Sequence, residues 1–181
     1  HFATIEARLN RYQHGNRDAL VMLRQRITDA GVDRTSRSSA SRLTAEVANL
    51  LIYEGDLVHA KQLLDLPLDP SAMLSLAQCR LALVAGDPSR AFTCAEQAMA
   101  QGHADQSDSC VAALLAAVAL DANGDHTAAL QELEELDLES PDPKLQQALS
   151  TVPYKPLHEL AKTHATQKGP RLLRLVEGPP N

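Results

Sequence analysis

Apolar and small residues fall into helix-length segments along the chain, and short runs of polar residues, glycine and proline separate them. The segments predict an all-α fold of tandem antiparallel helix hairpins, because only a few turn residues separate successive helical stretches. Loops are expected at 31–39, 66–70 and 102–107, and the serine-rich stretch 36–41 is assigned to the first of them. Helices are expected near residues 2–13, 17–29, 40–54, 57–65, 71–85, 88–101, 107–122, 126–136, about 141–150, 154–165 and 171–176.

A repeated Gly-Asp pair is the strongest feature of the pattern. It occurs at Gly55-Asp56, Gly86-Asp87 and Gly124-Asp125, with the glycines 31 and 38 residues apart. A small residue stands seven positions before each glycine, and an alanine follows four or five positions after it. The small residues are Ala48, Cys79 and Ala117, and the alanines are Ala60, Ala91 and Ala128. A weaker fourth copy surrounds Gly15-Asn16.

The Gly-Asp pair has a physical reading. Glycine adopts the left-handed conformation that ends a helix, and aspartate accepts hydrogen bonds from the unpaired N–H groups at the start of the next one. Pro88 follows Asp87 at the first helical position, where proline is tolerated. We therefore expect each pair to close a tight hairpin, with the small residues at the seam between its helices.

Composition fits closely packed helices and disfavours several other classes. The 181 residues include no Trp, two Phe and three Tyr, so the core must consist of Leu, Ala and Val. Residues 61–150 carry a net charge of −10, which argues against direct nucleic-acid binding by this segment. No stretch approaches the roughly 18–20 apolar residues of a membrane span. Cys79, Cys94 and Cys110 form no CxxC pair, so we expect buried thiols in a reducing, cytoplasmic compartment.

The glycine and alanine spacing resembles tetratricopeptide repeats, although the usual period of about 34 residues is kept loosely. Residues 40–176 resemble the MalT-like repeat region of large LuxR-type bacterial transcriptional regulators. The segments Val152–Ala161 and Pro170–Val176 are similar to the part that joins the repeats to the DNA-binding domain in those regulators. We accordingly divide the chain into a repeat domain, 1–150, and a C-terminal helical extension or linker, 151–181, leading towards a further domain.

This resemblance implies a sensor and coupling segment that binds a small effector or a partner protein. No GxxxxGK[ST] phosphate loop is present, so an ATPase domain would lie upstream. No recognition helix follows Val176, so DNA binding is expected from a downstream domain. A free-standing adaptor that recognises a peptide or a helix is the alternative. Terminal repeats without polar caps also predict a capacity to form oligomers.

No arrangement of residues in the sequence indicates catalysis, a cofactor or a metal site. The seven histidines show no HExxH or other tight ligand spacing. His103, Asp105 and Asp108 share one stretch, which we interpret as a solvated loop, and His126 follows a helix cap and should be exposed. Glutamates 132, 134 and 135 are interpreted as solvating the last repeat helix. An enzyme on this helical fold remains the least favoured hypothesis.

Binding is expected instead on the concave face, which the first helix of each hairpin lines in stacked arrays. Arg42, Asn49 and Arg80 are predicted to project from first helices towards that groove. Asn49 and Arg80 occupy the same repeat position, six residues before the glycine. Polar groups there can hydrogen-bond a sugar, a peptide carboxylate or another polar effector, while ordinary surface side chains are the alternative reading.

Overall fold

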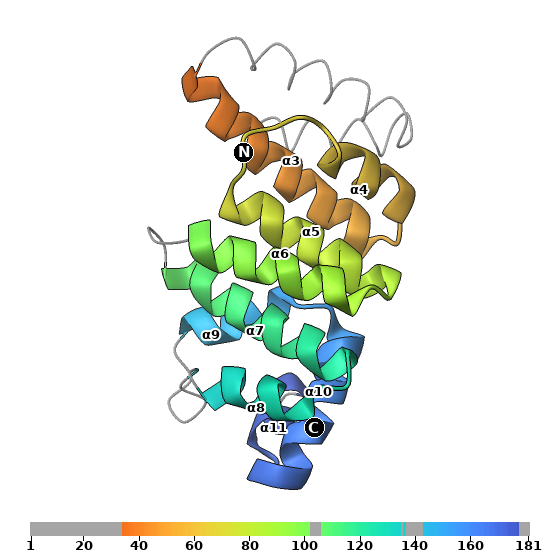
Figure 1. Ribbon diagram of the computed structural model, residues 1–181, viewed down its shortest axis with the longest axis vertical. Helices are drawn as coiled ribbons and strands as arrows, with labels where there is room; N and C mark the ends of the chain where they lie inside the picture. Colours follow the sequence, from red (N-terminus) through yellow and green to blue (C-terminus); the bar gives the residue numbers. More distant parts are fainter. Residues whose placement is uncertain (1–33, 102–105, 135, 137–142, 178–181) are drawn as a thin grey trace.

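The structure is a computed structural model that describes residues 34–101, 106–134, 136 and 143–177 (Figure 1). All regular elements in these ranges are helices, as predicted. They are α3 (Arg34–Tyr53), α4 (Leu57–Leu64), α5 (Ala72–Ala85), α6 (Pro88–Gln101), α7 (Gln106–Ala122), α8 (His126–Glu134), α9 (Pro143–Thr151), α10 (Tyr154–Lys168) and α11 (Arg171–Glu177). The helices predicted near 2–13 and 17–29, and the weak repeat around Gly15-Asn16, lie outside the described residues.

The helices from α3 to α8 form three successive hairpins, α3–α4, α5–α6 and α7–α8 (Figure 1). Each first helix packs on its own partner, and α5 also contacts both α3 and α7. The first helices α3, α5 and α7 therefore stack on one another through the array. This arrangement confirms the predicted all-α helical repeat fold.

The three Gly-Asp turns have the same backbone geometry. Gly55, Gly86 and Gly124 adopt φ values of 81°, 79° and 89°. In each turn the aspartate N–H donates to the carbonyl five residues earlier, with N···O distances of 2.8, 2.9 and 2.9 Å. These bonds satisfy carbonyls at the helix end that have no partner within the helix, so the turn sequence itself ends the helix.

The aspartates also cap the following helices, as the sequence predicts. The Oδ1 atom accepts from the backbone N–H three residues later in every turn, at 3.3 Å for Asp56, 3.1 Å for Asp87 and 3.1 Å for Asp125. A side-chain cap of this kind typically contributes about 1 kcal/mol to stability. One residue thus completes the end of one helix through its N–H and the start of the next through its carboxylate.

Small residues occupy the seam of each hairpin. Ala48, Cys79 and Ala117 are fully buried, and so are Ala60 and Ala91 on the second helices. In the third hairpin the fully buried alanine is Ala129, five residues after Gly124, whereas Ala128 is only half-buried. The prediction for Ala128 was therefore wrong by one position, because the position five residues after the glycine is the one that faces the partner helix.

The serine-rich stretch 36–41 is not a loop, contrary to the prediction. Helix α3 begins at Arg34 and includes all of it. Ala40 and Ser41 are buried, and Ser41 Oγ donates to the Asp69 carbonyl at 3.1 Å in the link between the first two hairpins. Burial of small side chains against this link compensates for the modest helix propensity of serine.

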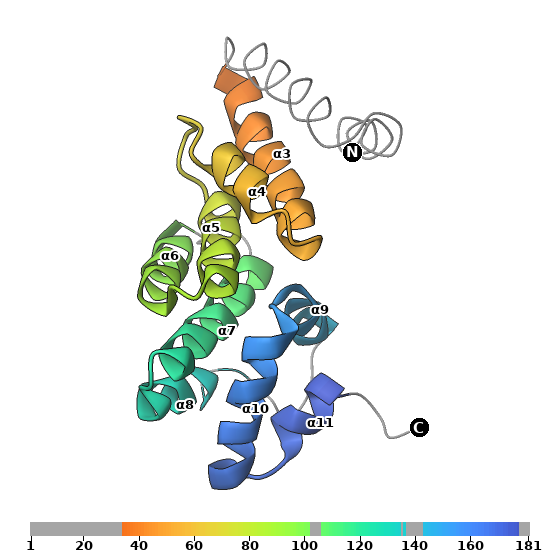
Figure 2. The same ribbon diagram turned by 90° about the vertical axis from the view of Figure 1, so that its right-hand side faces the viewer.

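Helices α9, α10 and α11 form a group beside α7, with α7 lying between α9 and α6 (Figure 2). Leu157, Leu160 and Leu172 join Leu114 and Leu115 of α7 in one continuous apolar core. The core therefore extends past residue 150, although the division at 150/151 stays a prediction. Within the described part of the chain, no helix has both the length and the apolarity that a membrane span requires.

Candidate functional site

Arg80 joins three helices at the candidate site. Its Nη1 atom donates to Asn49 Oδ1 of α3 at 3.3 Å, and its Nε atom donates to the Thr151 carbonyl at the end of α9 at 2.9 Å. These partners lie 31 and 71 residues away in the sequence. One guanidinium of the second hairpin thereby connects the first hairpin with the C-terminal helices.

The repeat explains how Asn49 and Arg80 meet. Both stand six residues before a hairpin glycine, so they occupy equivalent points on the stacked helices α3 and α5. The third hairpin has Val118 at this position, and Val118 is fully buried in the core that α7 shares with α10 and α11. The polar row therefore stops where the C-terminal helices cover the array.

The structure does not bring Arg42 into this junction. Arg42 is exposed on α3 and its Nε atom pairs with Glu46 Oε1, one helical turn away, at 3.2 Å. It stands two turns before Asn49 on the same helix. An exposed pair of this type contributes about 0.3 to 0.5 kcal/mol, so its contribution to the fold is small.

Sequence reasoning missed Thr151 as the third partner. Its contribution is a backbone carbonyl at the last residue of α9, where helical carbonyls lack partners and carry partial negative charge. A charged donor such as a guanidinium suits that acceptor. No side-chain pattern marks the carbonyl, so only the way in which α9 packs against α7 reveals this contact.

Exposed apolar residues lie about one helical turn along the chain from each junction residue. Tyr53 and Val84 stand one helical turn after Asn49 and Arg80, and their side chains are 90% and 43% exposed. Tyr154, three residues after Thr151, is 60% exposed. The site therefore combines a polar centre with apolar surface on α3, α5 and α10, which can contact a partner as well as a polar ligand.

The histidines form pairs that the spacing did not predict. His126 is about half exposed, as expected, and its Nδ1 atom lies 2.7 Å from Oδ1 of the buried Asp121. His158 Nε2 lies 3.1 Å from Glu177 Oε1, which ties α10 to α11. His164 is buried, and its Nδ1 atom has no hydrogen-bond partner within the described residues. Burial lowers the pKa of His164. A hydrogen bond with the Gly169 backbone raises this pKa in part, and the charge of the nearby Lys168 lowers it.

In the part of the chain that the structure describes, the remaining candidate groups do not converge on a reactive centre. Lys168 Nζ lies 2.8 Å from Glu134 Oε1, and this hydrogen bond lowers the pKa of Glu134. Among the described residues, no three histidine, cysteine or acidic side chains are grouped to hold a metal ion. His103, Asp105 and Glu135 lie outside the described residues, as does the side chain of Asp108, and Glu132 has a bonding partner.

Two of the cysteines are buried free thiols, as predicted. Cys79 and Cys94 lie on facing helices of the second hairpin, while Cys110 is half-buried. Burial, together with the neighbouring Cys94, raises the pKa of Cys79 to about 12. Burial also raises the pKa of Cys94, although Arg90 opposes the rise. Neither thiol is suited to act as a nucleophile, because the thiolate is the reactive form.

Comparison of the chain with protein-family models, with curated proteins and with solved structures gives no match.

Proposed function

We propose that the chain is a non-catalytic binding and coupling domain, in which a ligand or partner held by the first helices alters the attachment of the C-terminal helices. The observation that carries this proposal is the pair of Arg80 hydrogen bonds, to Asn49 in the repeat array and to Thr151 at the end of α9. A ligand carboxylate or hydroxyl that bonds to Arg80 competes with the Thr151 carbonyl for the same donors. Occupation of this site is thereby linked to the position of α9.

The proposal includes a setting for this domain. The tetratricopeptide-like repeats and the C-terminal segments that resemble LuxR-type regulators support a sensor and coupling role within such a cytoplasmic regulator. DNA contact would then belong to a domain downstream and nucleotide hydrolysis to a domain upstream. Sequencing the flanking regions of the gene tests this setting. A phosphate loop before the repeats and a helix-turn-helix after them support it, and their absence counts against it.

A free-standing adaptor is the second candidate, and the exposed Tyr53, Val84 and Tyr154 around the junction favour it. Tyrosine is enriched at protein interfaces because its ring is apolar and its hydroxyl can bond. An adaptor would use this surface to hold a peptide or helix of another protein. The terminal hairpins could then also contribute contacts between copies of the chain.

A thermal-shift screen distinguishes the two candidates. The protein and its Arg80→Ala variant are heated with oligosaccharides, small metabolites and short peptides. A sensor is expected to show a ligand-specific rise in melting temperature that Arg80→Ala loses, because binding to the native state raises stability. A rise with short peptides alone favours the adaptor, and the absence of any rise with oligosaccharides and metabolites removes the small-effector hypothesis.

A further inference from the structure

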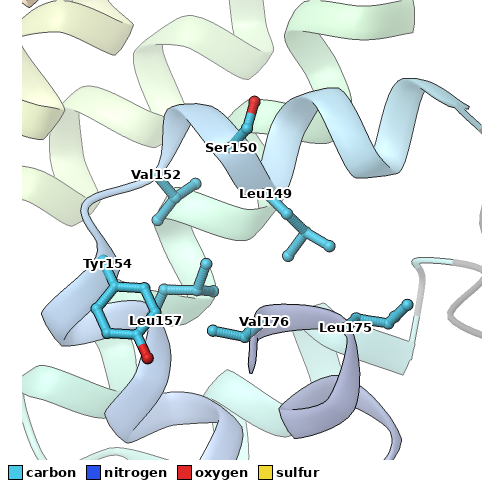
Figure 3. Close-up of a pocket in the computed structure, with 7 residues that line it drawn as sticks. All are labelled: Leu149, Ser150, Val152, Tyr154, Leu157, Leu175 and Val176. Atoms are coloured by element: carbon cyan, nitrogen blue, oxygen red, sulfur yellow. The ribbon is translucent and has the colours of Figure 1, made fainter. Parts of the chain in front are cut away.

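A pocket of about 410 Å³ lies between α9, α10 and α11 (Figure 3). Its apolar lining consists of Leu149, Val152, Tyr154, Leu157, Leu175 and Val176. Leu149 and Val152 approach the space from the end of α9 and the turn after it, Leu157 from α10 and Val176 from α11 (Figure 3). Ser150 also borders the pocket, but its hydroxyl points away from these side chains (Figure 3).

The Tyr154 ring stands at the edge of this pocket because other contacts hold it. It stacks on the His158 imidazole with a centroid distance of 5.4 Å and an interplanar angle of 15°. His158 in turn bonds to Glu177 of α11. Val152 and Leu157 are buried and Val176 is half-buried. Apolar side chains that face an unfilled space gain free energy when an apolar group displaces water from them.

Two cationic side chains are sequence neighbours of the lining residues. Lys155 follows Tyr154 on α10, and Arg174 precedes Leu175 on α11; both are exposed. Neither side chain makes an ion pair with any part of the chain that the structure describes. Glu177, the acidic residue at the end of α11, lies within hydrogen-bonding distance of His158. Residues 154–177 carry a net charge of +3, against −10 for residues 61–150. The two C-terminal helices that border the pocket therefore carry a net positive charge, which favours an anionic group over a cationic one.

We propose that this pocket binds a small amphiphilic carboxylate, such as a medium-chain fatty acid or an alkyl-substituted aromatic acid. The apolar body lies against Val152, Leu157 and Val176, and the carboxylate remains at the opening near Lys155 and Arg174. Pockets for small molecules typically have volumes of about 300 to 1,000 Å³, and the volume of this pocket lies in that range. The site goes beyond the proposed function, since Arg42, Asn49 and Arg80 are not part of it.

Methyl NMR spectroscopy with decanoate as the probe tests the proposal on the whole chain. Saturable shifts are expected for the methyl groups of Val152, Leu157 and Val176. Val176→Trp fills the space and is expected to weaken decanoate binding by about tenfold or more, the loss that corresponds to displacing a few buried methylene groups. Val58→Trp is the matched control, because Val58 is 68% exposed on α4, and it is expected to leave the affinity unchanged.

The carboxylate assignment is tested with 1-decanol, a neutral molecule of the same chain length. The double variant Lys155→Ala/Arg174→Ala removes only exposed side chains and is expected to fold. It should bind decanoate about fivefold more weakly, as expected for two exposed charge contacts, and bind 1-decanol as the wild type does. The proposal is overturned if decanoate does not bind saturably, if the shifts map elsewhere, if Val176→Trp binds equally well, or if the double variant keeps its affinity for decanoate.

Discussion

Replacing Ala91 by leucine tests the seam that holds the repeat together. Ala91 is fully buried where α6 faces α5, in the same core cluster as Cys79 and Cys94. Leucine adds three carbon atoms at a place with no exposed surface to receive them, so neighbouring side chains must leave their preferred rotamers. Overpacking of this kind costs about 1 to 3 kcal/mol. In a chain of this length each kcal/mol corresponds to about 2 to 4 °C in melting temperature.

The control is Ala100→Leu, because Ala100 lies on the same helix and is exposed. Alanine and leucine have similar helix propensities, so this variant measures how the substitution affects stability at an exposed position outside the seam. Thermal and urea unfolding, followed by the helical circular dichroism signal, should show a lower midpoint for Ala91→Leu only. Equal midpoints for the two leucine variants would refute the assignment of Ala91 to a tightly packed seam.

Two further predictions concern a turn and a buried histidine. Gly86→Ala should destabilise the protein by about 1 to 2 kcal/mol through its positive φ alone, because an added Cβ meets no atom within 4 Å. Gly86→Asn should lose less unfolding free energy than Gly86→Ala in urea unfolding, because asparagine adopts positive φ more readily than alanine. Equal losses in the two variants would contradict positive φ as the cause. Burial lowers the pKa of His164, so the unfolded chain takes up the proton first as the pH falls. The stabilising contribution of neutral His164 should be fully present above about pH 6.5 and decrease below it. In urea titrations, His164→Gln should therefore lose less unfolding free energy than the wild type between pH 7.5 and 5.5. An equal loss in the two proteins would assign the pH dependence to other groups.

The turns could be predicted from sequence because their determinants are local. A glycine with positive φ and an aspartate that caps the next helix act within about five residues of each other, so the pattern at Gly86-Asp87 identifies both helix ends. The burial of Cys79 and Ala91 follows from counting along helices whose ends are already known. For the same reason the one-residue error at Ala128 has a clear origin, since an adjacent alanine, Ala129, obscures which position faces the seam.

Contacts between distant segments could not be predicted in the same way. The equivalent repeat positions of Asn49 and Arg80 placed these two residues on the same face of successive hairpins. Nothing in the sequence indicated that the Thr151 carbonyl would meet Arg80, because that contact depends on the packing of α9 against α7. The helical state of residues 36–41 was missed because serine has little preference of its own, and tertiary burial of Ser41 decides the outcome.

Hydrogen exchange of the α9 amides tests most directly whether Arg80 couples the repeat array to the C-terminal helices. Arg80→Ala removes the donors to Asn49 and Thr151 and should speed exchange in α9 by about fivefold, the effect of losing about 1 kcal/mol of local stability. Arg90→Ala is the matched control, since Arg90 is an exposed arginine on α6, and it should leave α9 unchanged. Faster exchange in α9 for Arg80→Ala alone is the predicted result. Identical α9 exchange in the wild type and Arg80→Ala would contradict the coupling.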